Sequence, residues 1–224
     1  METKCSVCEN RSSCFNELSL NELSKVTNNK AEILYRKGET LIKQNASASH
    51  IYFIKRGLVK IHVESENKSL ILEIAGKSSM LGITSLNHSN RYNFSVTAIE
   101  DVEACEIDIE TIKGIVNNNV GFSSVVITEL NRKIDKLLSK VYCLSQKNIQ
   151  SRMADLLISF SNEVFMSREF VLVLSRHELA ELTNMATENV VRTLKEFNNK
   201  GLIELSGKRI KILDFKKLNE LSLK

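Results

Sequence analysis

The sequence contains no proline, and none of its apolar runs is long enough to cross a lipid bilayer. Its first residues, Met1 to Cys8, are polar and lack the hydrophobic stretch of a secretory signal. These features predict a cytoplasmic protein. In that reducing compartment the five cysteines are expected to be free, metal-bound or redox-active rather than paired in disulfides. The lack of proline has no structural explanation in the sequence.

The chain also carries little net charge. Its 31 basic and 27 acidic residues leave a formal charge of +4, which is compatible with nucleic-acid binding but does not argue for it. Apolar residues make up 42% and charged residues 26%, so the composition is that of an ordinary globular protein. The 224 residues suffice for one large or two small domains. Any partner must therefore be inferred from local motifs.

Short strand-like stretches separated by turn residues extend from about residue 31 to residue 109. Asn45 lies where a turn requires a left-handed conformation, which asparagine tolerates. Repeated short strands at this spacing predict a small antiparallel barrel or roll. The predicted strands include Ile33–Tyr35, Ile51–Ile54, Leu58–Val63, Leu70–Ile74 and Phe94–Ile99.

The apolar period becomes helical from about Val120 to Leu144, without a helix-breaking residue. Apolar residues recur alternately after three and four positions, with a β-branched residue at every a position and leucine at every d position. This choice favours a parallel two-stranded coiled coil, whose seam is Ile127, Leu130, Ile134, Leu137, Val141 and Leu144. An amphipathic helix packed on its own core is the alternative, but the seam is narrow and charged residues surround it. We therefore predict a homodimer.

A second domain is predicted to begin at residue 148. The apolar face of its first helix consists of Ile149, Met153, Leu156 and Phe160. A strand is expected at residues 170–174. The last part, residues 202–213, has two apolar stretches on either side of Gly207 and predicts a β-hairpin wing.

Between these strands the sequence predicts two helices joined by a short turn. Ser175 and Glu178 form a capping box, in which each side chain satisfies a backbone N–H group, so a helix begins here and extends to about Thr183. Asn184 can adopt the left-handed turn, and a second helix spans about residues 187–199. This arrangement is a helix-turn-helix.

The second of these helices has one apolar and one polar face. Its inward face is expected to consist of Val190, Leu194 and Phe197, and its outward face of Glu188, Val191, Arg192 and Lys195. A solvated charged face is the alternative, but the second helix of a helix-turn-helix lies in the major groove. Because glutamate accepts from cytosine N4 and arginine donates to guanine O6 and N7, Glu188 and Arg192 can address one G·C pair. Val191 offers a methyl contact to thymine. Candidate phosphate contacts are Arg176, Lys195, Lys208, Arg209 and Lys211.

With these motifs the chain resembles the Crp/Fnr family of transcription regulators over nearly its whole length. The most specific stretches are residues 174–180 and 188–192, where Glu188 and Arg192 match the family's Glu-x-x-x-Arg pair. The resemblance implies an α+β fold and a homodimer on inverted repeats of double-stranded DNA, with RNA polymerase as a partner. Val191 replaces the serine that is usual in the FNR branch, so the resemblance does not specify the outer bases of the DNA site.

The resemblance also implies a division into four parts. They are an N-terminal cysteine segment (1–20), a cyclic-nucleotide-binding-like β-roll sensor (21–115), a dimerisation helix (116–147) and a winged helix-turn-helix (148–224). Members that bind cyclic nucleotides carry Gly-Glu and Arg-Ser in the roll. The corresponding pairs here are Gly82-Ile83 and Tyr92-Asn93, so the carboxylate for the ribose and the arginine for the phosphate are missing. We therefore expect no cyclic-nucleotide binding.

Three cysteines near the N-terminus have the spacing Cys-x2-Cys-x5-Cys, and a fourth lies in the sequence Ala-Cys-Glu-Ile. This set is similar to the FNR type, whose four cysteines ligate a 4Fe–4S cluster, and the matching residues are Cys5, Cys8, Cys14 and Cys105. Four thiolates can also hold zinc, and Cys105 alone would pass as a small core residue. We predict a cluster whose first three ligands lie on a flexible segment. Cys143, on the predicted dimer helix, is interpreted as a packing residue.

Two other functional classes fit the sequence less well. An iron–sulfur electron carrier would need no groove-binding helix, and the histidines show no base–nucleophile motif, so no catalytic residue is predicted and the chain is not expected to be an enzyme. Within the regulator class, the alternative is a member without a cluster that binds zinc or an unknown small-molecule effector. Some oxygen-switched relatives place an acidic residue in the dimer seam, whereas this chain has Leu137. We therefore expect the cluster-free protein to remain dimeric.

Overall fold

The computed structural model describes residues 4–8, 13–66, 68–86 and 90–223, and the predicted N-terminal cysteine segment therefore lies partly outside the described residues. By its internal contacts the chain forms two compact units. One comprises residues 1–67 and 74–136, and the other comprises residues 68–73 and 137–224. None of the helices in the described ranges combines the length and the apolar character that spanning a membrane requires.

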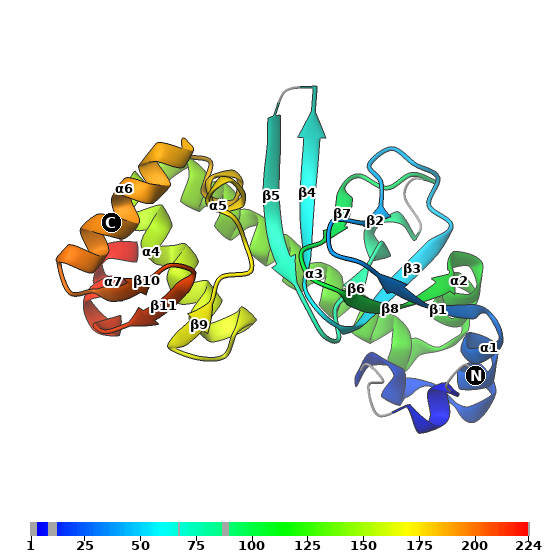
Figure 1. Cartoon of the computed structure of the whole chain (residues 1–224). Helices are drawn as coiled ribbons and strands as arrows, with labels where there is room; N and C mark the ends of the chain where they lie inside the picture. The colour runs from blue at the N-terminus through cyan, green and yellow to red at the C-terminus, as the bar shows by residue number, and fades with distance from the viewer. Residues whose placement is uncertain (1–3, 9–12, 67, 87–89, 224) are drawn as a thin grey trace. The chain divides into compact units, whose positions relative to one another are not determined.

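A β-roll makes up most of the first unit, as the strand pattern predicted (Figure 1). Its two four-stranded sheets have the orders β1-β8-β3-β6 and β2-β7-β4-β5. Asn45 is left-handed, with φ of 67°, and so confirms the predicted turn. The strands are β1 (Lys30–Tyr35), β2 (Thr40–Ile42), β3 (His50–Arg56), β4 (Val59–Ser65), β5 (Lys68–Ala75), β6 (Met80–Leu81), β7 (Ser95–Ala98) and β8 (Val102–Asp108).

In its described parts, the N-terminal cysteine segment packs onto the roll. It forms two 3₁₀ turns, η1 (Cys5–Val7) and η2 (Ser13–Glu17), followed by helix α1 (Leu20–Asn28). Cys5, Cys14, Phe15 and Leu18 are buried, and the Phe15 ring centroid lies 4.6 Å from that of Phe53 on β3. The segment contributes apolar side chains to the main core, and their burial outweighs its polar composition.

Helix α3 (Val120–Gln146) confirms the long helix predicted from Val120 to Leu144. It follows the 3₁₀ turn η3 (Ile83–Ser85), the last strands of the roll and helix α2 (Ile109–Asn118). Asp108 caps α2 by accepting from the Thr111 backbone N–H. Near its start, α3 buries Phe122 and Val126 in the core of the roll.

The second unit contains the helix-turn-helix and its wing. Its elements are α4 (Ile149–Ser159), the π-helical turn η4 (Phe160–Val164), β9 (Glu169–Val171), α5 (Arg176–Thr183), α6 (Thr187–Asn199), β10 (Ile203–Ser206), β11 (Arg209–Ile212) and α7 (Phe215–Ser222). Strands β10, β11 and β9 form one sheet in that order, which confirms the wing.

Three details of this unit differ from the expectation. The strand predicted at residues 170–174 is β9, which ends at Val171 because only its first residues pair with β11. On α4 the buried residues are Ser151, Met153, Ala154 and Leu157, whereas Ile149 and Leu156 of the predicted face are partly exposed. Helix α7, which packs on α4, was not predicted.

Candidate nucleic-acid interface and cysteine cluster

The turn between α5 and α6 is built by local side-chain chemistry. The Ser175 hydroxyl accepts from the Glu178 N–H at 3.1 Å, and the Glu178 carboxylate accepts from the Ser175 N–H at 2.9 Å. Asn184 ends α5 in the left-handed conformation, with φ of 49° and ψ of 53°. These contacts confirm the capping box and the turn residue that the sequence predicted.

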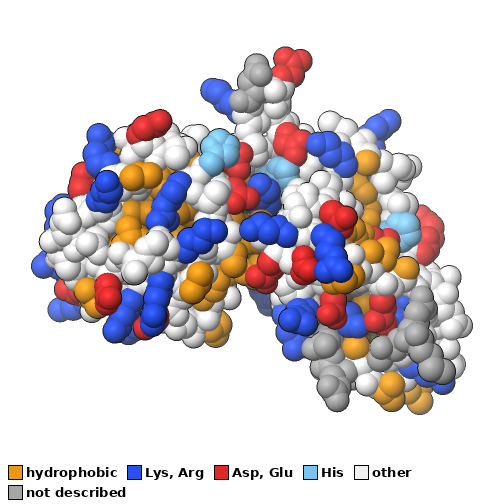
Figure 2. All heavy atoms as spheres, in the orientation of Figure 1, with side chains coloured by type: hydrophobic (Ala, Val, Ile, Leu, Met, Phe, Trp, Pro, Cys, Tyr) orange, Lys and Arg blue, Asp and Glu red, His pale blue; other side chains and the backbone are white. Residues whose placement is uncertain are grey.

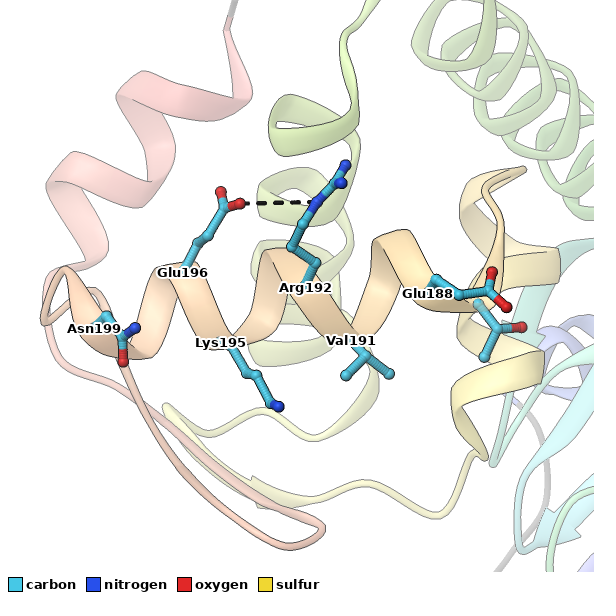
Figure 3. Close-up of a pocket in the computed structure, with 7 residues that line it drawn as sticks. Glu188, Val191, Arg192, Lys195, Glu196 and Asn199 are labelled. Atoms are coloured by element: carbon cyan, nitrogen blue, oxygen red, sulfur yellow. Dashed lines mark ion pairs between the residues drawn. The ribbon is translucent and has the colours of Figure 1, made fainter.

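Helix α6 has one buried and one exposed side. Val190, Leu194 and Phe197 are completely buried, as predicted for its inward face. The outward face borders a shallow open groove of about 520 Å³ (Figure 3). The residues that line it are Thr187, Glu188, Val191, Arg192, Lys195, Glu196 and Asn199. The four predicted outward residues therefore lie on one surface, together with three residues that sequence reasoning did not single out.

Arg192 is held in place by its own helix. Its Nη2 donates to Asn189 Oδ1 at 2.8 Å, and its Nε lies 3.9 Å from Glu196 Oε1. Glu196 in turn accepts from Gln150 Nε2 of α4 at 2.9 Å. In Figure 3, Arg192 and Glu196 project to one side of α6 and Val191 and Lys195 to the other. The i+4 spacing of Glu196 is the signal that would have identified it as a partner of Arg192.

The predicted phosphate contacts divide into two groups. Lys195, Lys208 and Lys211 are exposed. Arg176 Nη2 donates to the Gly207 carbonyl in the wing turn at 3.0 Å, and burial lowers the pKa of this guanidinium. Arg209 forms an ion pair with Glu169 of β9. Figure 2 shows lysine and arginine side chains spread over the face of this unit that is in view.

The predicted dimer seam lies mostly on the surface of α3. Ile127, Ile134, Leu137 and Val141 are each at least half exposed, which is unusual for a row of large apolar residues. Leu130 packs partly against the core of the roll, and Leu144 is half-buried. Sequence reasoning missed two further apolar residues of this helix, Leu138 (63% exposed) and Tyr142 (59% exposed), which widen the stripe.

The four cysteines of the predicted cluster all lie in described parts of the chain. Cys5, Cys14 and Cys105 are buried in one apolar core, and Cys8 is half-buried. Burial raises the pKa of the Cys105 thiol to about 11. In the described ranges, no three Cys, His, Asp or Glu side chains are grouped so that they could hold a metal ion. Three of the four thiols thus share one core, and the described side chains form no ready-made metal site.

Two lysines lie beside these thiols and were not anticipated. Lys30 Nζ lies 2.5 Å from one carboxylate oxygen of Glu32, and Lys55 Nζ lies 2.6 Å from the other. Burial would raise the pKa of Glu32, but hydrogen bonds from both lysines outweigh it and lower the pKa to about 2. Glu32 is the cross-strand neighbour of Cys105. Burial would lower the pKa of Lys30, but the hydrogen bond to Glu32 outweighs it and raises the pKa. Lys30 lies within electrostatic range of Cys5 and Cys105, and Lys55 within that of Cys8 and Cys105. Four soft thiolates with ammonium groups nearby suit an iron–sulfur cluster, because the cations offset its negative charge.

A tyrosine fills the part of the roll where nucleotide-binding relatives carry the Gly-Glu and Arg-Ser pairs. The buried Tyr92 donates its hydroxyl to the His50 carbonyl at 2.7 Å and accepts from the His50 N–H at 3.1 Å. Gly82 has φ of 85°, and a Cβ placed there would lie 3.1 Å from the same carbonyl oxygen and 3.3 Å from the Tyr92 ring. Protein groups therefore occupy the space beside Gly82.

Two family models match most of the chain. A model of the cyclic nucleotide-binding domain matches residues 32–119, and a model of the Crp-like helix-turn-helix domain matches residues 151–221. The first match covers most of the roll and α2, and the second covers α4 to α7, including the groove on α6.

Characterised relatives are similar over most of their length. The chain is 27% identical to the transcriptional activator protein FnrA of Stutzerimonas stutzeri over 80% of this chain and 75% of that protein. It is 24% identical to the anaerobic regulatory protein of Haemophilus influenzae over 92% and 81%. Among solved structures, FixK2 from Bradyrhizobium japonicum shares the fold, with a TM-score of 0.80 and 18% identity over 86% of this chain and 96% of that one.

Proposed function

The chain belongs to the Crp/Fnr family of DNA-binding transcription regulators, and on this premise we propose that it reads an inverted repeat through α6. The observation that carries the proposal is the exposed row of Glu188, Val191, Arg192 and Lys195 along one groove. The buried opposite face anchors the helix, so these side chains are the ones presented to a duplex. Its relatives are transcription regulators rather than enzymes.

Glu188 and Arg192 are the proposed base-reading pair. They lie one helical turn apart, both are exposed, and the Asn189 amide oxygen orients the guanidinium. An arginine that donates to guanine O6 and N7 and a glutamate that accepts from cytosine N4 together distinguish a G·C pair from the other pairs. Val191, which is 36% exposed, offers an apolar contact to thymine. Lys195, Lys208 and Lys211 are the proposed phosphate contacts.

Arg192→Ala tests this assignment. We expect the variant to lose about 1–3 kcal/mol of binding free energy on the specific inverted repeat and much less on random DNA, because only the base contact is lost. Lys195→Ala is the matched control, since a phosphate contact should weaken binding equally on both DNAs. Fluorescence anisotropy at fixed salt measures both. An equal loss on the two DNAs for Arg192→Ala would contradict base reading.

The active form is proposed to be a homodimer through α3. The support is the stripe of exposed apolar side chains, which a second copy of α3 would bury. Two copies of α6 related by a twofold axis would then contact half-sites about one helical turn apart. RNA polymerase is the proposed further partner, as the word activator in a relative's name suggests.

We further propose that Cys5, Cys8, Cys14 and Cys105 hold an oxygen-labile 4Fe–4S cluster, with binding favouring the DNA-binding dimer. The cluster would supply a centre that loses iron or sulfide on oxidation. Three observations support it: three of the four thiols share one core, Lys30 and Lys55 lie beside the thiols, and a relative is named an anaerobic regulatory protein. Because the thiols are not grouped as ligands, cluster binding requires η1 and η2 to rearrange. Tyr92 and the absence of the two nucleotide-binding pairs support a roll that binds no cyclic nucleotide.

Anaerobic reconstitution with iron and sulfide tests the cluster. We expect about four irons per chain and visible absorbance that bleaches in air. Cys14→Ser should lose this absorbance, whereas Cys143→Ser is the matched control and should keep it. A colourless protein with one bound zinc, or an unchanged spectrum in Cys14→Ser, would contradict the cluster and leave DNA binding in place.

A further inference from the structure

The C-terminal end of α5 is held by two cations from neighbouring helices. The last carbonyl groups of a helix have no partner within the helix. Here the Lys140 ammonium group of α3 donates to the Leu182 carbonyl oxygen. Arg152 Nη1 of α4 donates to the carbonyl oxygens of Thr183 and Asn184, at 3.0 and 3.1 Å. Three successive carbonyl groups at the turn before α6 are therefore bound from outside the helix-turn-helix.

The heptad position of Lys140 makes its contact with α5 unusual. Lys140 directly precedes the seam residue Val141. At this position, coiled coils normally carry an exposed charged residue that faces the partner helix. Instead the Lys140 side chain is partly buried, and burial lowers the pKa of Lys140 to about 8 from an ordinary value of 10.5. Burying an ammonium group is unfavourable unless it gains specific partners. Cys143 of α3 and Asp155 of α4 are the other titratable groups near it, and Asp155 is paired with Lys147 at 2.5 Å.

We propose that Lys140 and Arg152 are positioning residues for DNA recognition, which fix the turn before α6 to the end of the dimer helix. The negative end of the α5 dipole favours a cation at this place, and both side chains meet that end. Lys140 lies on α3 itself, so its bond connects the dimerisation element directly to the recognition element. The inference rests on the proposed dimer and on base reading by α6.

A rigid connection of this kind determines the separation of the two recognition helices in a dimer. The separation of the half-sites in the DNA must match that distance. If Lys140 no longer holds α5, each helix-turn-helix gains freedom relative to α3. The protein then binds the correctly spaced repeat more weakly. It also distinguishes this repeat less strongly from repeats whose spacing is one base pair shorter or longer.

The experiment compares inverted repeats that differ only in half-site spacing. For the full-length wild type, we expect affinity to fall by at least about tenfold when one base pair is added or removed. Lys140→Met should reduce this spacing discrimination to about threefold or less and weaken binding at the best spacing by about tenfold, the effect of losing a charged hydrogen bond. Arg152→Met, which releases the same turn from α4, should act in the same direction. Lys140→Arg should restore the discrimination.

Lys133→Met is the matched control, because Lys133 occupies the same heptad position one repeat earlier. It removes a comparable charge from α3 and should leave spacing discrimination as in the wild type. The positioning role is overturned if Lys140→Met and Arg152→Met, folded as judged by circular dichroism, discriminate spacing like the wild type. It is also overturned if Lys133→Met has the same effect. A wild type that binds no inverted repeat would instead contradict the proposed function itself.

Discussion

Helix α6 and strand β8 both carry the side chains proposed for function, but α6 exposes them and β8 buries them. Arg192 is 65% exposed along its side chain, whereas Cys105 is 9% exposed as a residue. A base-reading residue must meet its partner from solution, so exposure is the functional state. The cysteine thiols are buried without being grouped as ligands, so burial is the cluster-free state, and the proposed cluster binding requires η1 and η2 to rearrange. The α6 side chains are therefore tested by DNA binding, and the cysteines by reconstitution of the cluster.

The largest effect is expected within α6, where buried and exposed residues alternate. Phe197→Ala should lower the free energy of unfolding of the C-terminal unit by about 3–5 kcal/mol, because it leaves a cavity at a fully buried position. Val191→Ala on the exposed face should change it by less than about 0.5 kcal/mol. Urea unfolding followed by circular dichroism measures both. Equal losses of unfolding free energy in the two variants would contradict the assignment of one face of α6 as buried and the other as exposed.

A second large effect concerns the exposed apolar stripe of α3. Ile134→Lys should weaken the proposed dimer by about 2–3 kcal/mol or more, because the ammonium group would have to be buried in the seam. Sedimentation equilibrium measures the dissociation constant. Lys136→Gln on the same helix is the control and should leave it nearly unchanged. A wild type that is monomeric at all concentrations would contradict the dimer.

A pH-dependent effect is expected at Lys140. Its folded pKa of about 8 lies below the unfolded value near 10.5, so between these pH values the unfolded state binds more protons. Wild-type stability should therefore rise with pH relative to Lys140→Gln, by up to about 2 kcal/mol between pH 8 and 10.5. Urea unfolding at pH 7.5 and pH 10 checks the sign. The free energy of unfolding of Lys133→Gln should depend on pH in parallel with that of the wild type. If the difference in unfolding free energy between the wild type and Lys140→Gln is the same at both pH values, the burial of Lys140 is contradicted.

The smallest effect compares two capping boxes of the same design. Ser19→Ala at α1 and Ser175→Ala at α5 should each cost about 1 kcal/mol, because each serine accepts from the N–H three residues later. Only Ser175→Ala is expected to weaken specific DNA binding, since α5 supports α6. Thermal melting and anisotropy titrations with both variants test this. Equal loss of DNA binding in the two variants would contradict the separation of roles.

Much of the interface was predictable because helix period and cap chemistry act over a few residues. The outward face of α6 follows from the 3.6-residue repeat once Val190 and Leu194 are recognised as apolar anchors. Two predicted phosphate contacts were less simple. Arg176 reaches the Gly207 carbonyl and Arg209 pairs with Glu169, partners that lie more than thirty residues away in the sequence. No local pattern contains such information.

By itself, the sequence determined the roll, the long helix, the helix-turn-helix and the surface of α6, because each depends on periodicity or on neighbouring residues. Tertiary structure alone decided where the cysteine segment packs and which charges meet it. It decided also that Lys140, a surface residue by its heptad position, is partly buried against the end of α5, 42 residues away. Contacts between distant segments depend on how whole faces pack together, and burial then changes the energy of every charge that they enclose.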